Sequence, residues 1–284
     1  MKPLAPSSNN EKAVGNPNNA DYAPAARSFP RVSLFGVPFS DISFDELCST
    51  VESCVREKKF CCVVTPNVDH VCRFHRDADF RKAYLNADIV LCDGTPILWA
   101  SRLLRRPLRE KLSGSDLVFT MSEFAARRAL SVFLFGAAEG VAELAAQRLK
   151  KAYPGLRVAG VYSPPFGFMK DPRLIGESVR IVRDAKPDIC YVALGAPLQE
   201  FWIQNHGVQC DVPVMIGVGG SLDFAAGRLR RAPVWAQNAG VEWVWRLIQE
   251  PRRLWRRYLI EDLLIFRLFW HEWRNRRTQH SNAG

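Results

Sequence analysis

Short, continuous apolar runs alternate with longer amphipathic stretches over most of this chain. The apolar runs have the length of strands and fall at Phe60–Thr65, Asp88–Cys92, Ser131–Phe135, Leu156–Tyr162, Asp188–Leu194 and Val212–Val218. Because both alternate sets of side chains in each run are apolar, the runs are typical of strands covered on both faces. The pattern therefore predicts a sheet enclosed between helices.

The stretches between these runs have the spacing and length of helices. They span Val68–Leu85, Thr95–Leu104, Ser115–Ala129, Gly140–Ala152, Pro172–Ala185 and Leu198–Asn205. Strands that alternate with such helices form mainly parallel sheets with right-handed crossovers. We therefore predict an α/β fold, Rossmann-like in the broad sense, in which helices flank a mainly parallel sheet.

Composition divides the chain into three predicted parts. Residues 1–30 are rich in Asn, Pro, Ser and Ala, which predicts a disordered segment, and they lack the apolar core of a signal peptide. Residues 31–231 form the predicted α/β domain. Residues 232–284 form a basic, aromatic helical appendage, which we expect to associate with a membrane.

The segment Glu242–Arg277 is the source of that expectation, because it mixes many arginines with Trp, Tyr and Phe. The formal net charge of the chain is +10, which favours an anionic partner. Arginine binds phosphates through a planar fork, and aromatic side chains beside cations suit a lipid surface. The apolar run Leu259–Trp273 contains charged residues and is shorter than the roughly 20 apolar residues of a membrane span, so it is expected to lie on anionic lipid.

Two other classes of protein share parts of this pattern. A basic aromatic tail is also found in nucleic-acid-binding proteins, but its acidic residues and long apolar run favour lipid, so no nucleic acid partner is predicted. A nicotinamide oxidoreductase would have the same strand and helix alternation. It would also need a G-x-G-x-x-G turn and an acidic residue about 20 positions further on, and the sequence has neither in that context.

The eight cysteines show no C-x-x-C pair and no zinc-type spacing with histidines. Most of them lie inside apolar runs, where cysteine behaves as a small buried hydrophobe. Reduced thiols of this kind are typical of the cytosol. No metal site and no cofactor are predicted.

Candidate ligand-binding residues follow five of the predicted strands. In parallel α/β sheets, ligands bind beyond the carboxyl ends of the strands. The residues at these ends are Thr65–Asn67, Asp93–Thr95, Gly136–Gly140, Gly195–Glu200 and Gly217–Gly220. We expect them to meet at a single crevice.

Asp93 is the strongest catalytic candidate among them. With a raised pKa its carboxylate would accept a proton from a substrate hydroxyl, but an Asp at this position also commonly caps the following helix. Thr65 and Asn67 are suited to sugar hydroxyls, although Thr-Pro-Asn is also ordinary turn chemistry. Gln199 can donate and accept at once, and Glu200 would complement a helix dipole.

The glycine-rich strand ends favour a nucleotide. The turn that begins at Gly136 resembles a phosphate-binding turn without the full fingerprint. Gly217, Gly219 and Gly220, followed by Asp223, would let the backbone approach a ligand closely, although such a turn can also be purely structural.

Motifs along Val32–Leu259 resemble those of the WecG/TagA/CpsF family of bacterial glycosyltransferases. In chain order the matching motifs are T-P-N at 65–67, A-D-I-V-L-C-D-G at 87–94, S-G-S-D-L at 113–117, F-L-F-G at 133–136, L-G-A-P-L-Q-E at 194–200, G-V-G-G-S-L-D-F at 217–224, R-A-P-V-W at 231–235 and E-W-V-W-R-L-I-Q-E-P-R-R-L at 242–254. So many ordered matches are far more specific than any one motif.

The resemblance implies an inverting, metal-independent transfer of a sugar from a UDP-sugar to a polyprenyl-diphosphate-linked sugar, in exopolysaccharide or surface-glycan biosynthesis. Asp93 matches the family's catalytic base. Thr65, Asn67 and Gln199 match the polar residues around the donor or acceptor sugar. The implied location is peripheral, on the cytoplasmic face of the inner membrane, with self-association left open.

The resemblance also implies which cations meet the diphosphate. Lys111 stands where the family usually has an arginine, which keeps the charge but loses the bidentate fork, and Arg109 is an alternative for that role. Arg246, Arg253 and Arg256 match the arginines expected to face the diphosphate. Helical spacing would place 246 and 253 on one face, with 256 three residues further on.

The donor sugar is the least determined feature. The tail resembles most the xanthan-type, GumM-like branch of the family, which implies glucose as the donor. The alternative is N-acetylmannosamine or its uronic acid, which other members of the family transfer.

Overall fold

The computed structural model describes residues 29–281, except for the side chains of Val234, Asn238, Arg253 and 276–281. The predicted disordered segment, residues 1–30, lies almost entirely outside this range.

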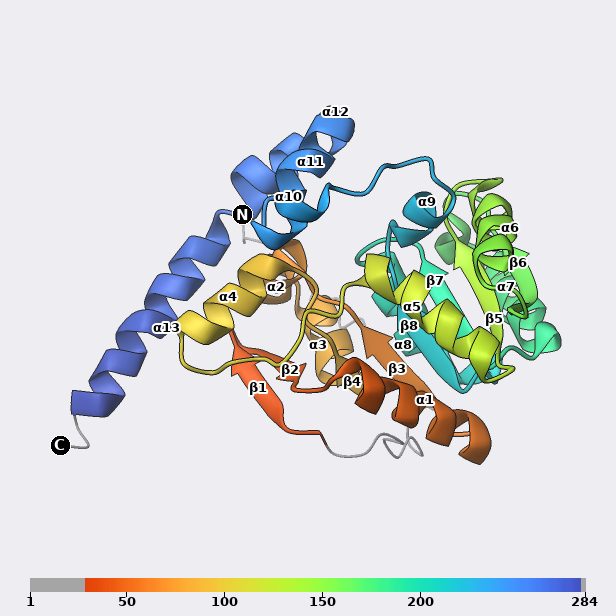
Figure 1. Ribbon diagram of the computed structural model, residues 1–284, viewed down its shortest axis with the longest axis horizontal. Helices are drawn as coiled ribbons and strands as arrows, with labels where there is room; N and C mark the ends of the chain where they lie inside the picture. The colour runs from red at the N-terminus through yellow and green to blue at the C-terminus, as the bar shows by residue number, and fades with distance from the viewer. Residues whose placement is uncertain (1–28, 282–284) are drawn as a thin grey trace, which may run out of the picture.

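A six-stranded parallel sheet forms the centre of the described part (Figure 1). Its strands, in spatial order, are β4 (Ile89–Val90), β3 (Cys61–Val64), β8 (Val214–Gly217), β7 (Ile189–Ala193), β5 (Ser131–Gly136) and β6 (Arg157–Tyr162). All six strands predicted from the sequence are present, with ends within two residues of the predicted ones. The predicted α/β class is therefore confirmed.

Helices cover both faces of this sheet. They are α2 (Val68–Arg76), α3 (Ala78–Leu85), α4 (Thr95–Leu103), α5 (Gly114–Arg127), α6 (Val141–Ala152), α7 (Pro172–Ala185) and α8 (Leu198–His206). The single helix predicted over Val68–Leu85 is two helices. They separate at Asp77, whose side chain caps α3 by accepting hydrogen bonds from the N–H groups of Asp79 and Phe80.

Alternate strand residues enter two separate cores, as the apolar runs predicted. In β7, Ile189 and Tyr191 pack into a core with residues of α1, α5 and α6. Cys190 and Val192 point to the opposite core, which contains residues of α2, α3, α7 and α8. This double burial explains why the strands carry no polar face.

A hairpin and a helix at the N-terminal end were not predicted. Strands β1 (Arg31–Leu34) and β2 (Val37–Ser40) pair antiparallel, and α1 (Phe44–Glu57) follows them. The start of α1 has a signal in the sequence, because Ser43 and Glu46 form a capping box with reciprocal backbone hydrogen bonds.

The C-terminal segment is helical, as predicted, and gathers at the end of the molecule away from β6 (Figure 1). After α9 (Ser221–Ala225) it comprises α10 (Val234–Asn238), α11 (Glu242–Gln249), α12 (Pro251–Arg256), the π-helical η4 (Arg257–Glu261) and α13 (Leu264–Ser281). Over the described residues, no helix combines the length and the apolar character needed to cross a bilayer.

Helix α13 is packed onto the α/β domain along one of its faces. Ile265, Leu268, Phe269 and Trp273 lie against the core that contains α2 and α4. The Glu272 carboxylate accepts a hydrogen bond of 2.5 Å from the backbone N–H of Phe35. The contacts of the C-terminal segment therefore cross the predicted boundary at residue 231.

Candidate active site

The strand order brings all five predicted strand ends to one edge of the sheet. Strands β4, β3, β8, β7 and β5 are consecutive neighbours, so the residues that follow them lie along this edge. The Thr65 hydroxyl, after β3, donates a hydrogen bond of 2.8 Å to the carbonyl of Gly217, at the end of β8. The backbone N–H of Asp93, after β4, donates to the carbonyl of Pro66 at 3.1 Å.

Asp93 does not cap the helix that follows it. Gly94 is the N-cap of α4, and that helix end has no side-chain cap. The Asp93 carboxylate instead accepts a hydrogen bond of 3.3 Å from the N–H of Gly114, in the first turn of α5. The sequence left capping and catalysis open, and this geometry leaves the carboxylate available for chemistry.

The pKa of Asp93 is raised to about 6, chiefly because burial disfavours the charged form. The Glu242 carboxylate raises it further, whereas the Gly114 hydrogen bond, Lys111 and Arg246 lower it. A carboxylate that ionises near neutrality at the carboxyl edge of a parallel sheet has the properties of a general base.

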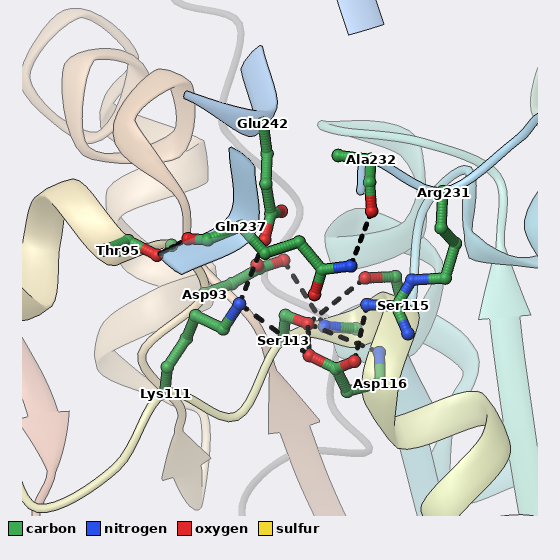
Figure 2. Close-up of polar contacts among 12 residues, drawn as sticks. Asp93, Thr95, Lys111, Ser113, Ser115, Asp116, Arg231, Ala232, Gln237 and Glu242 are labelled. Atoms are coloured by element: carbon green, nitrogen blue, oxygen red, sulfur yellow. Dashed lines mark hydrogen bonds and ion pairs between the residues drawn. The ribbon is translucent and has the colours of Figure 1, made fainter. Parts of the chain in front are cut away.

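Three ion pairs lie around this carboxylate (Figure 2). The Lys111 ammonium lies 3.1 Å from a Glu242 oxygen and 4.0 Å from an Asp116 oxygen. On the other side of Asp116, the Arg231 guanidinium lies 2.5 Å from its second oxygen. The loop before α5 is thus tied to α11 through Lys111 and Glu242, and the first turn of α5 is tied through Asp116 to Arg231.

Asn67 is the N-cap of α2, as its position at a strand-to-helix turn suggests. Its side-chain oxygen accepts from the N–H of His70 at 3.3 Å and from the Arg257 guanidinium at 3.1 Å. The same guanidinium lies 3.3 Å from an Asp69 oxygen. Asn67 therefore caps α2 and also accepts a hydrogen bond from Arg257 of the C-terminal segment.

Gln199 is only 1% exposed and is engaged at both ends of its amide. Its oxygen accepts from the N–H of Gly219 at 2.8 Å, and its nitrogen donates to Glu200 at 3.0 Å. Both polar atoms of the Gln199 side chain therefore bond to other protein groups, namely Gly219 and Glu200.

The glycines at the strand ends have different physical roles. A Cβ at Gly136, which has φ +101°, would lie 2.7 Å from the carbonyl of Ala193, so close packing between β5 and β7 requires glycine there. Gly219 has φ +56° and turns the chain after β8. A Cβ at Gly220 would lie 3.6 Å from Arg246 and 3.9 Å from Asp223, which places these two side chains beside the turn.

The predicted arginine spacing is wrong, because the tail is not one continuous helix. Helix α11 ends at Gln249 and α12 starts at Pro251, so the spacing of 246 and 253 on one helix does not apply. Arg246 lies over the ring of Phe224 and close enough to Asp93 to lower its pKa. Arg256 is largely exposed and pairs with Glu261, whereas Arg257 contacts Asn67.

Arg109 does not take the place of the family arginine. Its guanidinium lies 3.3 Å from Asp41 and 3.0 Å from Glu46, beside the start of α1. Of the two basic residues considered for that role, Lys111 is the one near Asp93.

Four residues around the crevice were not predicted from the sequence: Asp116, Arg231, Glu242 and Arg257. Three of them lie inside or at the edge of motifs that did appear, namely S-G-S-D-L, R-A-P-V-W and E-W-V-W-R. Their pairing joins segments more than 100 residues apart, which no local pattern reveals.

The cysteines are buried and unbridged, as predicted. Within residues 29–281, no cluster of three or more His, Cys, Asp or Glu side chains is arranged to hold a metal ion.

A parallel α/β sheet with an ionisable carboxylate among cations at its carboxyl edge is an arrangement typical of enzymes. The sequence model of the Glycosyl transferase WecG/TagA/CpsF family matches residues 32–279. The chain belongs to this family and is a glycosyltransferase.

Several characterised relatives share one name, N-acetylglucosaminyldiphosphoundecaprenol N-acetyl-beta-D-mannosaminyltransferase. The protein of Bacillus spizizenii is 32% identical over 74% of this chain and 79% of its own length. That of Bacillus subtilis is 29% identical over 80% of this chain and 86% of its own length. That of Staphylococcus aureus strain MW2 is 28% identical over 80% of this chain and 87% of its own length.

Proposed function

We propose that this glycosyltransferase moves an N-acetylmannosaminyl group from a UDP-linked donor to N-acetylglucosamine on a polyprenyl diphosphate. The relatives' names support this donor and acceptor, and they fit the alternative donor better than the glucose that the tail suggested. The reaction is proposed to invert the anomeric centre and to need no metal ion.

The observation that carries the proposal is the Asp93 carboxylate. It follows β4 at the sheet edge, is held by the Gly114 N–H and has a pKa raised to about 6. At neutral pH such a group is mostly ionised and still basic enough to remove a proton from a hydroxyl as that hydroxyl attacks.

In the proposed step, an acceptor hydroxyl attacks the anomeric carbon of the donor and gives its proton to Asp93. The bond from that carbon to the diphosphate oxygen breaks, and UDP leaves with the bonding electrons. Thr65 and Asn67 are proposed to line the sugar sites, because both follow β3 beside Asp93.

The negative charge of the leaving group needs cations or N–H donors. We assign this role to Lys111, Arg246 and Arg257, since these lie around Asp93 and Asn67. Arg253 remains a proposed member of the set, whereas the exposed Arg256 is no longer one. The turn Gly217–Gly220 with Asp223 is proposed to face the nucleotide.

The outer face of α13 is proposed to rest on the membrane that holds the acceptor. Phe266 and Trp270 are both more than half exposed on that face, Arg267 is exposed beside them, and Leu263, which immediately precedes the helix, is also more than half exposed. Large apolar side chains with neighbouring cations suit an anionic lipid surface.

The test is UDP release from a panel of UDP-sugars, with N-acetylglucosaminyl-diphosphate-polyprenol as the acceptor. UDP-N-acetylmannosamine is expected to support turnover, and preference for UDP-glucose would overturn the assigned donor. Asp93→Asn should abolish turnover, whereas Asp184→Asn, in an exposed pair with Arg180, should not. Full turnover by Asp93→Asn would remove Asp93 as the base.

A further inference from the structure

A chain of buried polar side chains lies behind the Gly219 turn. It begins at the Gly219 N–H, which donates to the Gln199 oxygen at 2.8 Å. The Gln199 nitrogen donates to Glu200 at 3.0 Å, and the Tyr84 hydroxyl donates to the same Glu200 oxygen at 3.3 Å. The Tyr84 oxygen lies 3.1 Å from a ring nitrogen of His70.

These side chains are enclosed by protein. Gln199, Glu200 and Tyr84 are 1–2% exposed, and His70 is 8% exposed. Buried polar groups are costly unless they are paired, and each of these four side chains has a partner within the group. The second Glu200 oxygen is buried and meets no hydrogen-bond partner among the described residues.

The pairing also fixes which way the Gln199 amide faces. The Gly219 N–H can only donate, so it must meet the amide oxygen, and the amide nitrogen must then meet an acceptor. Glu200 supplies that acceptor. Without it the amide would lose its nitrogen partner, and the orientation that holds Gly219 would no longer be enforced.

These buried polar side chains connect the segments that follow three neighbouring strands, β7, β8 and β3. Gln199 and Glu200 lie in the first turn of α8, after β7, and Gly219 follows β8. His70 lies in the first turn of α2, next to the capping residue Asn67 that follows β3. Glu200 is the middle member, since it contacts both Gln199 and Tyr84.

We propose that Glu200 is a positioning residue for glycosyl transfer, which holds the Gln199 amide and, through it, the Gly217–Gly220 turn in the geometry that the substrates need. This role rests on the proposed function, because the turn is assigned there to the nucleotide. Glu200 itself does not touch the crevice residue Asp93 and is not a catalytic residue.

The contacts of Glu200 require an acceptor rather than a negative charge. Burial raises the pKa of Glu200 to about 7 and lowers that of His70 to about 4, so at neutral pH His70 is uncharged and Glu200 is about half protonated. Glu200→Gln keeps an oxygen that can accept from both Gln199 and Tyr84. Glu200→Ala removes that acceptor and leaves the Gln199 nitrogen unpaired.

Turnover of the full-length protein tests the proposal first. Glu200→Ala should lower kcat roughly ten- to a hundredfold, as misplaced groups do, with less change in KM. Glu200→Gln should recover most of the loss. Because Gln199 and Glu200 act as a unit, the double variant Gln199→Ala/Glu200→Ala should have a kcat within about twofold of that of the less active single variant.

A matched control separates positioning from general stability. Tyr191 is another fully buried tyrosine, whose hydroxyl lies 3.2 Å from that of Ser122 in the opposite core. Tyr84→Phe and Tyr191→Phe each remove one buried hydroxyl, so both should lower the melting temperature by similar amounts. Only Tyr84→Phe should lower kcat.

Backbone hydrogen exchange gives a readout that needs no substrate. In Glu200→Ala, the peptide that covers 217–223 should exchange faster, because the Gly219 N–H loses its fixed acceptor. Tyr191→Phe should leave that peptide unchanged. If the wild type turns over no acceptor yet this exchange pattern holds, the proposed function fails and the positioning of the turn stands.

Three results would overturn the role of Glu200. The first is hydrogen exchange over 217–223 that is unchanged in Glu200→Ala. The second is a loss of activity in the double variant that equals the sum of the two single losses in free energy. The third is a fall in kcat that follows the fall in melting temperature equally in Tyr84→Phe and Tyr191→Phe.

Discussion

The Lys111 ammonium and the Glu242 carboxylate lie 3.1 Å apart beside Asp93, and their ion pair joins the loop before α5 to the first turn of α11. These two charges have opposite effects on Asp93, because Glu242 raises its pKa and Lys111 lowers it. The C-terminal segment therefore contributes to the electrostatics of the proposed base as well as to its surroundings.

Glu242→Gln should move the acidic limb of the pH profile of kcat/KM to lower pH. The replacement removes a negative charge near Asp93, so the carboxylate ionises more easily, by a shift of roughly half to one pH unit. Lys111→Met, the opposite change, should move the limb to higher pH. Equal profiles for both variants would contradict the assignment of this limb to Asp93.

Asp93 itself predicts a loss of activity in acid. A base must be ionised, and the pKa of Asp93 is about 6, so kcat/KM of the wild type should fall about tenfold for each pH unit below that value. A wild-type profile that stays flat down to about pH 4.5 would be incompatible with Asp93 as the base.

Asp93→Asn should also change stability, in a pH-dependent direction. The ordinary pKa of an aspartate is 3.8, whereas that of Asp93 in the folded protein is about 6. Ionisation of Asp93 therefore opposes folding, and the loss of folding free energy develops between these two pH values and is complete above about pH 6. The variant should therefore be more stable than wild type at neutral pH, on the order of 1 kcal/mol, and equal to it below about pH 4. Thermal melts across this range measure the difference.

Arg257 and Arg256 are adjacent arginines with different environments, and they form a matched pair. Arg257→Met should lower kcat/KM by roughly ten- to a hundredfold, because it removes a charge-assisted hydrogen bond to Asn67 and a proposed diphosphate contact. Arg256→Met should have little effect, since its side chain is exposed and pairs with Glu261. Steady-state kinetics with varied acceptor distinguish the two, and the reverse ranking would return Arg256 to the site.

The outer face of α13 can be tested without disturbing its inner face. Phe266→Ser and Trp270→Ser together should reduce cosedimentation with anionic vesicles about tenfold or more, as expected for two exposed aromatic side chains beside cations. Melting temperature should be unchanged, because both side chains face outward. Phe166→Ser, at an exposed apolar position outside the C-terminal segment, is the control and should bind like wild type.

Deleting the C-terminal segment is a less specific test of membrane binding. Residues of α13 cover part of the core, and Leu254 and Asp262 are buried, so truncation after Arg231 would uncover apolar surface. The truncated protein should be destabilised by several kcal/mol, and a lost activity would then have two causes. Point substitutions on the outer face avoid this ambiguity.

Local patterns were enough to predict most of the fold. The strands were found because each is apolar on both faces, and Asp93, Thr65 and Gln199 were found because ligand sites follow parallel strands. The break at Asp77 and the start of α1 at Ser43 were missed, although both have capping residues. The break between α11 and α12 was missed despite Pro251, because the arginine spacing was counted along one uninterrupted helix.

By itself, the sequence determined the parallel α/β class and the family, and it indicated the sheet edge at which we propose the active site, since these depend on periodicity and on short motifs. Only the tertiary structure decided that Asp93 is held by Gly114 rather than capping α4, that Lys111 meets Glu242, and that Arg257 rather than Arg256 reaches Asn67. Such pairs join residues distant in the chain, and a side chain's partner, burial and pKa depend on the packing of the whole molecule. The basic, aromatic tail is the clearest case, because its composition indicated anionic partners and its packing decided that Arg257 contacts Asn67 whereas Arg256 pairs with Glu261.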